Sequence, residues 1–440
     1  MLIFGSQILV IVIALIAVAF ALVAFIATGT VLSKMMWILV IASASPLFDL
    51  FGSEDGLSKQ ILWASLFSIC VVYIFFGAKR QSVKLGLVEL PFWLGLLCLY
   101  AVLTIAWSPI PVTSIKRFIQ FLGIIIVGIA IIRYESSTPL HVRLLIPCAL
   151  LMVIGLIVGY LTQKIWPLGG VALTGLASHK NQWGLFLLVT STLAVSAVLC
   201  RKMVKVSVLV LAVSIYSILL TKSATALVGL LVLLSIVCVL YLGRGLGSSA
   251  DKTLIALFLF FLLVALPLSV YVVRMGVLPI DAAIETFFSS TGRDSSLTGR
   301  DNLWRLMRIE IAKHAFFGVG YGGFWTGISE GPSNAVTNQI FWGVPVQAHN
   351  GYLDFVNELG VVGMSLFVAL IAWYLRVVWL LSRRCDKSIW LFPALYLVIF
   401  LVTNTTETTL LRPTHFLWIV FVICCVYLKV GLLRLREVAS

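Results

Sequence analysis

One histidine in the sequence stands beside polar residues in a pattern that suits acid–base chemistry. His349 and Asn350 open the segment His349-Asn-Gly-Tyr-Leu-Asp, and Asp354 and Glu358 follow with a spacing of four residues. That spacing places the two carboxylates on one helix face, although it leaves open whether either of them reaches His349. A histidine titrates near neutral pH, so His349 is the best candidate for a general base. The alternative is that His349 only caps or hydrogen-bonds a helix that re-enters the membrane.

A second group of polar residues lies within or against apolar segments. Charges at membrane depth are expensive, and they usually face a bundle interior or a water-filled cavity. Four such segments on one face predict a cationic pocket, which would suit a pyrophosphate because Lys and Arg bind phosphate oxygens through charge-assisted hydrogen bonds. Taken singly, each charge is also explained as a snorkelling residue or a structural ion pair. The group comprises Arg117, His179, Lys180, Asn181, Lys222, Glu407 and Arg412.

An amphipathic helix of about four turns is predicted from Thr298 onward. Leu303, Leu306 and Met307 recur at helical spacing, and Thr298 is a suitable cap. The first half of this helix carries Arg300, Arg305 and Arg308. Two interpretations stay open: an interfacial helix with a solvated basic face, or an arginine platform over the cationic pocket.

The glycine-rich run that follows this helix is not a nucleotide-binding loop. Gly318-Val-Gly-Tyr-Gly-Gly follows a helix instead of opening one, and it lacks the Gly-Lys-Ser/Thr ending. A helix stop followed by a tight turn explains it better. Asp49, Glu54 and Asp55 form an acidic loop more simply than a metal site, so we expect neither metal nor cofactor.

The composition places these residues in a membrane protein. The chain has 440 residues, of which 61% are hydrophobic and 11% are charged. Repeated apolar runs have the length of about 20 residues that spans a bilayer as a helix. We therefore predict an all-α polytopic fold with about 12–13 transmembrane helices. The runs lie at 8–28, 35–51, 60–77, 91–107, 118–132, 142–161, 184–200, 206–220, 225–242, 254–273, 360–381, 389–403 and 415–429.

The distribution of basic residues predicts the orientation. The net charge is +14, but the basic residues occupy short loops, so nucleic-acid binding is not expected. Most of them fall in alternate loops and in the C-terminal tail, which makes that side cytoplasmic. We divide the chain into transmembrane helices 1–10 (1–274), a long outer loop that carries the amphipathic helix (275–350), and C-terminal transmembrane helices (351–440).

Six short segments follow one another along the chain in a distinctive order. They are Ser178-His-Lys-Asn, Thr221-Lys-Ser-Ala-Thr, Gly299-Arg-Asp-Asn-Leu-Trp, Phe317-Gly-Val-Gly-Tyr-Gly, His349-Asn-Gly-Tyr-Leu-Asp and Thr406-Glu-Thr. In this order they resemble the O-antigen ligase and polymerase superfamily of bacterial envelopes, and within it the exopolysaccharide polymerases of the succinoglycan type. The resemblance covers roughly residues 100–420, and the ordered combination is more specific than any single motif.

The resemblance implies a GT-C-like membrane glycosyltransferase of the bacterial inner membrane, with its active site facing the periplasm. Its donor would be an oligosaccharide on undecaprenyl pyrophosphate, transferred by a metal-independent, inverting reaction. Membrane lipids and a chain-length regulator would be its other partners. On this resemblance His349 would act on the acceptor hydroxyl or orient it, and Arg300 with Arg305 would neutralise the departing pyrophosphate. His179, Lys180 and Asn181 would line the donor site.

Four functions remain to be weighed. A polymerase of lipid-linked repeats is favoured by the His-Lys-Asn element, and a ligase that transfers glycan to lipid A–core uses the same fold. A transporter of such lipids would need many spans and buried charges as well, but we see no repeat symmetry, and a carrier would place its site near the midplane. A non-catalytic scaffold would not need buried cations.

Overall fold

The computed structural model describes residues 64, 67–68, 89–134, 138–162, 172–242, 298–325, 331–340 and 345–439. Every regular element in these ranges is a helix, as predicted. The helices are α4 (Phe92–Leu103), the short 3-10 helix η4 (Thr104–Trp107), α5 (Pro111–Tyr134), α6 (Leu140–Thr162), α7 (Lys180–Leu199), α8 (Val204–Thr221), α9 (Ala224–Leu242), α13 (Thr298–Lys313), α14 (Asn334–Thr337), α15 (Gly351–Arg384), α16 (Lys387–Thr403) and α17 (Phe416–Ala439).

The apolar helices confirm a polytopic membrane protein. In the described residues, 6 helices are long and apolar enough to cross a membrane, and α4 with η4, α9 and α16 are shorter apolar helices. Each of them covers one of the predicted runs between residues 91 and 429. The runs at 8–28, 35–51 and 254–273 lie outside the described residues, as do nearly all of 60–77 and the predicted boundary between 274 and 275.

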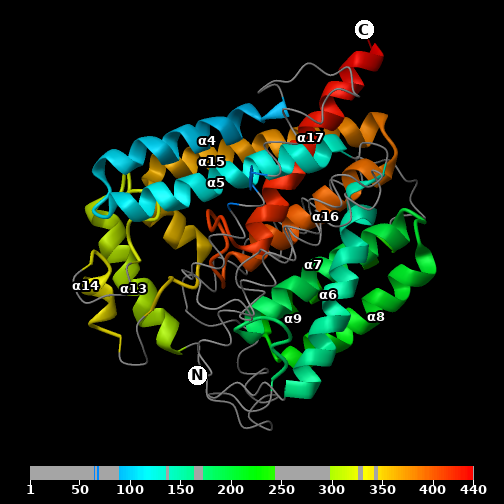
Figure 1. Ribbon diagram of the computed structural model, residues 1–440, viewed down its shortest axis with the longest axis horizontal. Coiled ribbons are helices and arrows are strands. Elements are labelled where there is room, and N and C mark those ends of the chain that lie inside the picture. Colours follow the sequence, from blue (N-terminus) through cyan, green and yellow to red (C-terminus); the bar gives the residue numbers. More distant parts are fainter. Residues whose placement is uncertain are drawn as a thin grey trace.

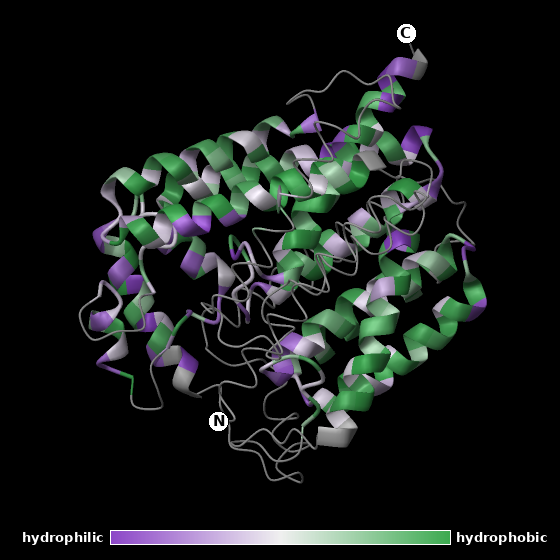
Figure 2. Ribbon diagram, viewed as in Figure 1, coloured by the Kyte–Doolittle hydropathy of each residue, from purple (hydrophilic) through white to green (hydrophobic). Residues whose placement is uncertain are grey.

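The helices pack into two groups joined by α16 and α17. Helix α15 packs along α4, and α5 packs along α17, whereas α7 contacts α6, α8 and α9 (Figure 1). Helix α16 contacts α7, α9, α15 and α17, so it links the groups. The long helices are predominantly hydrophobic, and hydrophilic residues gather at helix ends and in connecting segments (Figure 2).

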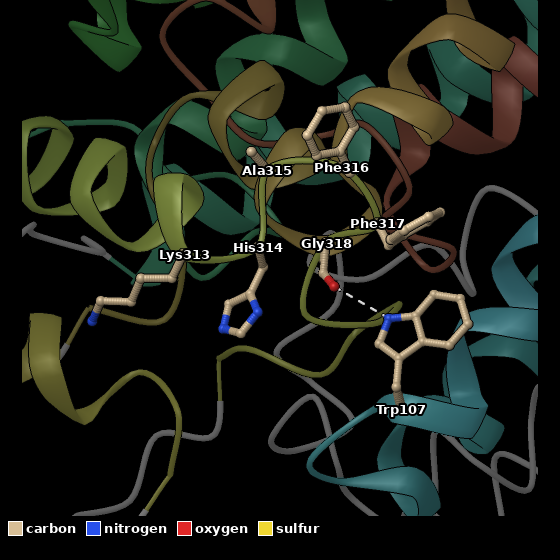
Figure 3. A pocket seen from close by; sticks show the side chains of 7 residues that line it. All are labelled: Trp107, Lys313, His314, Ala315, Phe316, Phe317 and Gly318. Atoms are coloured by element: carbon tan, nitrogen blue, oxygen red, sulfur yellow. Dashed lines mark hydrogen bonds between the residues drawn. The ribbon is translucent and has the colours of Figure 1, made fainter.

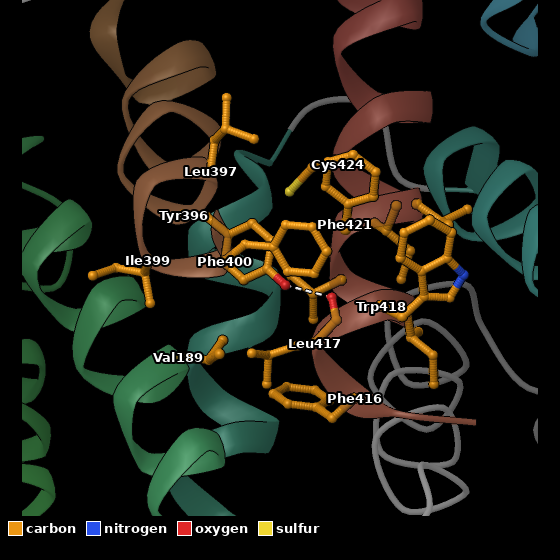
Figure 4. Close-up of a cluster of buried hydrophobic side chains, with 14 of the residues drawn as sticks. Val189, Tyr396, Leu397, Ile399, Phe400, Phe416, Leu417, Trp418, Phe421 and Cys424 are labelled. Atoms are coloured by element: carbon orange, nitrogen blue, oxygen red, sulfur yellow. Dashed lines mark hydrogen bonds between the residues drawn. The ribbon is translucent and has the colours of Figure 1, made fainter. Parts of the chain in front are cut away.

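Aromatic side chains fill the contact between α16 and α17. The rings of Phe400 and Phe421 stack with centroids 4.6 Å apart, and Trp418 packs against both. The Tyr396 hydroxyl donates to the Leu417 carbonyl at the start of α17 (Figure 4). These contacts fix α16 against α17 and so fix the two ends of the segment between them, residues 404–415.

Helix α15 is broken by a kink at Gly360. Gly360 has φ 63° and ψ −169°, and a Cβ there would lie 2.3 Å from the Phe316 carbonyl oxygen. The chain after α13 approaches the kink closely, since the Val361 N–H donates to the Ala315 carbonyl at 2.8 Å. Glycine is required by both the backbone angle and the close approach. The segment 351–359 is therefore a short helix of its own, ahead of the predicted span 360–381.

The amphipathic helix predicted from Thr298 is α13, and its apolar face packs on protein. Leu303, Trp304 and Met307 are buried in a small separate core. The Trp304 indole N–H donates to the Ala348 carbonyl at 2.8 Å. This packing argues against a helix that lies on lipid and favours a structural link between α13 and the residues before His349. The other members of the small core are Leu306, Val319, Phe324, Trp325, Val336, Ile340 and Ala348.

The chain directions give the bundle two distinct ends. Helices α7, α9 and α15 begin at the end where α16 stops and α17 starts, and we call this the polar end. The opposite end holds the C-termini of α7, α15 and α17. Basic residues concentrate there, at Arg201, Lys202, Arg383, Arg384, Arg434 and Arg436.

Candidate active site

A polar turn closes the polar end between α16 and α17. Asn404 organises it, because its side-chain oxygen accepts hydrogen bonds from the backbone of Thr409 and Leu410, each at 3.0 Å. The Gly351 N–H donates to the carbonyl of Asn404 at 2.8 Å and to that of Glu407 at 3.2 Å. The turn is thereby tied to the first residue of α15.

Glu407 is the centre of this turn and contacts three of the predicted site residues. Its Oε1 accepts a hydrogen bond from Asn181 Nδ2 at 2.7 Å and lies 3.5 Å from Arg300 Nη2. Its Oε2 lies 3.5 Å from His349 Nδ1. The Glu407 side chain is only 8% exposed. The fold therefore brings together residues from α7, α13, the turn before α15 and the segment after α16.

Arg300 is held in place by the same turn. Its Nη1 donates to the Thr406 carbonyl at 2.9 Å, while Nη2 faces Glu407. Burial alone would raise the pKa of Glu407, but the hydrogen bond from His349 and the charge of Arg300 outweigh it and lower the pKa to about 2. Glu407 is therefore a carboxylate at neutral pH.

His349 is not the cap of α15. Asn350 takes that role, since its side-chain oxygen accepts from the backbone of Tyr352 at 3.1 Å and Leu353 at 3.2 Å. His349 instead adopts a left-handed conformation with φ 49°, and its Nδ1 faces Gln347 and Glu407. In the tautomer protonated at Nδ1, the ring donates to Glu407 and keeps Nε2 as an acceptor, which is the arrangement that a general base needs.

His179, which directly precedes α7, is close enough to Glu407, His349 and Arg300 for their charges to affect its pKa. The ring of His179 caps α7, because its Nδ1 accepts from the Asn181 N–H at 3.1 Å. Burial lowers the pKa of His179 to about 4; Glu407 opposes this shift, and Lys180 adds to it. His179 is therefore neutral at pH 7, and Lys180 and His349 are near enough to influence it.

Four other predicted site residues form a separate ion cluster. Arg412 lies 3.3 Å from Asp354 and 3.1 Å from Glu358, and Arg117 lies 3.8 Å from Glu358. Glu358 also accepts the Gly322 N–H at 2.8 Å. The Asp354 and Glu358 carboxylates thus face the arginines, and the carboxylate beside the His349 ring is Glu407. This arrangement favours a role for Arg117 and Arg412 in holding α15 against the chain around Gly322.

The remaining two predicted cations stand on α13 and directly after α8. Arg305 is exposed, and its Nη2 donates to Asn302 Oδ1 at 2.9 Å, so it diverges from Arg300 although both stand on α13. Lys222 ends α8 in a left-handed conformation with φ 50°. Of the two interpretations left open for α13, an arginine platform is supported only at Arg300, which contacts Glu407.

Sequence reasoning missed the polar residues that build the turn around Glu407. Asn404 orders the turn, Thr406 holds Arg300, and Thr408 donates from its hydroxyl to Asp354 Oδ2 at 2.7 Å. Their signal was present, since Thr403-Asn-Thr-Thr-Glu-Thr-Thr is an unbroken polar run between two apolar runs. Thr406-Glu-Thr was recognised as a matching segment, but only Glu407 was selected from it as a site residue, because threonines also occur commonly in turns.

A hollow of about 510 Å³ lies away from the Glu407 group. Its lining includes Trp107 and the residues from Lys313 to Gly318, at the end of α13 opposite Arg300 (Figure 3). The Trp107 indole N–H donates to the Gly318 carbonyl at 3.2 Å. This bond attaches the turn after α13 to the last residue of η4. None of the predicted site residues lines this hollow. The acidic group at Asp49, Glu54 and Asp55 lies outside the described residues.

Comparison with known proteins agrees with the motifs. Residues 209–368 match the model of the O-Antigen ligase family, a range that includes Arg300 and His349 but not Asn181 or Glu407. The chain is 25% identical over 334 residues, 73% of either chain, to the exopolysaccharide production protein ExoQ of Rhizobium meliloti (strain 1021). These matches confirm the resemblance to the O-antigen ligase and polymerase superfamily. The apolar helices independently indicate a multi-pass membrane protein.

Proposed function

We propose that this protein is a glycosyltransferase that polymerises undecaprenyl-pyrophosphate-linked oligosaccharide repeats into exopolysaccharide or O-antigen. The observation that carries this proposal is the group around Glu407. A histidine with one nitrogen facing a carboxylate, an arginine fixed beside it and an asparagine from α7 meet at one end of a membrane bundle.

The chemistry assigns a separate task to each side chain. Nε2 of His349 takes the proton of the acceptor hydroxyl as its oxygen attacks the anomeric carbon of the donor, and the bond to the lipid pyrophosphate breaks with inversion. Glu407 stabilises the histidine once it is protonated. Arg300 offsets the negative charge that develops on the leaving pyrophosphate.

Helix orientation supports an anionic donor at this end. The N-termini of α7, α9 and α15 meet the 404–409 turn: Asn181 binds Glu407, Thr225 lies 3.1 Å from Thr406 between hydroxyl oxygens, and Gly351 binds two carbonyls of the turn. Each N-terminus carries a partial positive charge that favours phosphate. With Lys180 at the start of α7, these ends suit the donor pyrophosphate.

The distribution of basic residues supports a periplasmic site. The end of the bundle opposite Glu407 holds Arg201 and Lys202, between α7 and α8, and Arg383 and Arg384, in the last turn of α15. Positive loops stay in the cytoplasm. The Glu407 group would then face the periplasm across the inner membrane, where lipid-linked repeats and a chain-length regulator are expected partners.

The second candidate is a ligase that transfers glycan to lipid A–core, and the description of the matching family model favours it. The name of the Rhizobium relative, an exopolysaccharide production protein, favours the polymerase. A lipid-linked glycan transporter is the third candidate. It has less support, because the polar group lies at one end of the bundle and not at its centre.

Glycan analysis in a complemented host separates these functions. A strain that lacks its own polymerase but makes the matching lipid-linked repeat would receive either the wild-type gene or His349→Ala, and its glycans would be separated on a gel. We expect a ladder of lengthening repeats that is lost with His349→Ala at equal protein level. Single repeats on lipid A–core would identify a ligase, and unchanged glycans would contradict both transferase proposals.

Metal independence has its own test. The purified protein in lipid nanodiscs, with the same lipid-linked repeat as donor, would be assayed before and after treatment with a chelator. We expect an unchanged rate. A loss of activity that returns when Mg²⁺ or Mn²⁺ is added back would show that transfer needs a metal ion.

A further inference from the structure

One carboxylate oxygen connects the neighbours of the two central residues. Asp354 Oδ2 accepts the Ala348 N–H at 3.0 Å and the Thr408 hydroxyl at 2.7 Å. Ala348 directly precedes His349, and Thr408 directly follows Glu407. A single atom on α15 thus links the two chain segments that carry the proposed base and its carboxylate partner.

This carboxylate is itself held on its other side. Asp354 Oδ1 accepts the Trp325 indole N–H at 2.7 Å, and Arg412 lies 3.3 Å from Oδ2. Asp354 and Thr408 are 2% and 3% exposed. A buried, fully partnered carboxylate has little freedom to move, so it can fix the groups that donate to it.

The two central residues need such an anchor because each stands in a turn. His349 has a left-handed backbone conformation, and Glu407 lies in the polar turn between α16 and α17. Their side chains are 3.5 Å apart, near the outer limit of a hydrogen bond. A small displacement of either turn would break the contact, and small misplacements of catalytic groups reduce rates strongly.

We propose that Thr408 and Asp354 are positioning residues that set Glu407 against His349. The inference rests on the proposed function, since it assumes that the pair takes part in transfer. Thr408 holds the Glu407 side and the Ala348 N–H holds the His349 side, with Asp354 between them. The hydrogen bonds of the His349 ring go to Gln347 and Glu407, and those of Thr408 and Asp354 go to other atoms.

The test uses two matched substitutions at Thr408. Thr408→Val keeps the shape but removes the hydroxyl, and Thr408→Ser keeps the hydroxyl. The full-length protein in nanodiscs would be assayed for kcat and KM with a lipid-linked repeat extracted from a polymerase-deficient strain. We expect Thr408→Val to lower kcat about tenfold with the donor KM nearly unchanged, and Thr408→Ser to restore most of the rate. Equal kcat in all three proteins would overturn the inference.

A double-mutant cycle separates positioning from a general loss of packing. If Thr408 acts through Glu407, Thr408→Val should cause no further loss in a Glu407→Gln background. Multiplied losses would show that Thr408 acts independently of Glu407 and would overturn the inference. His349→Ala is assayed in parallel: activity in that variant refutes the proposed base, whereas an inactive His349→Ala beside a fully active Thr408→Val refutes only the positioning role.

Discussion

The side-chain amide of Asn181 donates to the carboxylate of Glu407 at 2.7 Å, across 226 residues of sequence. This bond connects the start of α7 with the turn after α16, and Arg300 and His349 approach the same carboxylate. A buried acid with these three partners is costly to assemble, because each group gives up its contacts with water. Buried charged groups of this kind cluster at functional sites. The Glu407 group is therefore the strongest candidate for chemistry in the described residues.

Glu407→Gln should reduce transfer about a hundredfold, within the range measured for groups that assist proton transfer. The amide keeps an oxygen for Asn181 but loses the charge that faces His349 and Arg300. The rate would be measured in nanodiscs with a lipid-linked repeat. Glu310→Gln is the matched control, because Glu310 pairs with Lys313 at the far end of α13 and should leave the rate unchanged. A fully active Glu407→Gln would contradict the role of the carboxylate.

Arg300→Lys should keep part of the transfer rate, whereas Arg300→Ala should lose nearly all of it. Lysine retains a positive charge but lacks the forked geometry that serves Thr406 and Glu407 together. Arg305→Ala should cause a smaller loss, because Arg305 is exposed and bonded to Asn302. Separate values of kcat and donor KM decide the role. A full loss of kcat in Arg300→Lys with unchanged KM would indicate that Arg300 acts in the transition state only.

Arg412→Met should destabilise the fold by about 3–5 kcal/mol, because it leaves the buried carboxylates of Asp354 and Glu358 without their nearest cation. Arg117→Met should have a weaker effect, since Arg117 is 25% exposed and 3.8 Å from Glu358. Unfolding by denaturant in detergent micelles measures both variants. If Arg412→Met were as stable as the wild type but bound the donor poorly, Arg412 would belong to the pyrophosphate site, as its sequence position predicted.

The free energy of unfolding should decrease as the pH is lowered from about 6.5 to about 4, in part because of His179. Its pKa in the fold is about 4, below its ordinary value of 6.5. In that range the unfolded chain binds a proton that the folded chain does not, so lowering the pH favours unfolding. The effect is fully developed once the pH is below about 4.

His179→Asn tests this assignment, because asparagine also caps helices but does not titrate. Thermal unfolding midpoints would be compared from pH 7 to pH 4, and the variant should lose less stability than the wild type. Part of the dependence should remain, because burial also lowers the pKa of His415 to about 4. Identical pH profiles would mean that His179 is not held neutral by the fold.

The sequence by itself determined the fold class, the positions of most helices and the type of protein. Runs of about 20 apolar residues can satisfy their backbone in a bilayer only as helices, and so the predicted spans agree with α4 to α9 and α15 to α17. The amphipathic spacing of Leu303, Leu306 and Met307 likewise predicted α13 from local information. The order of several motifs was enough to predict the resemblance to the superfamily, because the ordered combination is more specific than any single motif.

Only the tertiary structure decided which charges face one another. Asp354 and Glu358 are close to His349 in sequence, yet helix direction carries their carboxylates to Arg412, which comes from the turn before α17. Glu407 is distant in sequence, but the packing of α16 against α7 and α15 brings it to His349. Periodicity specifies which face of a helix a residue occupies, whereas the partner of that face depends on how helices far apart in the chain pack together.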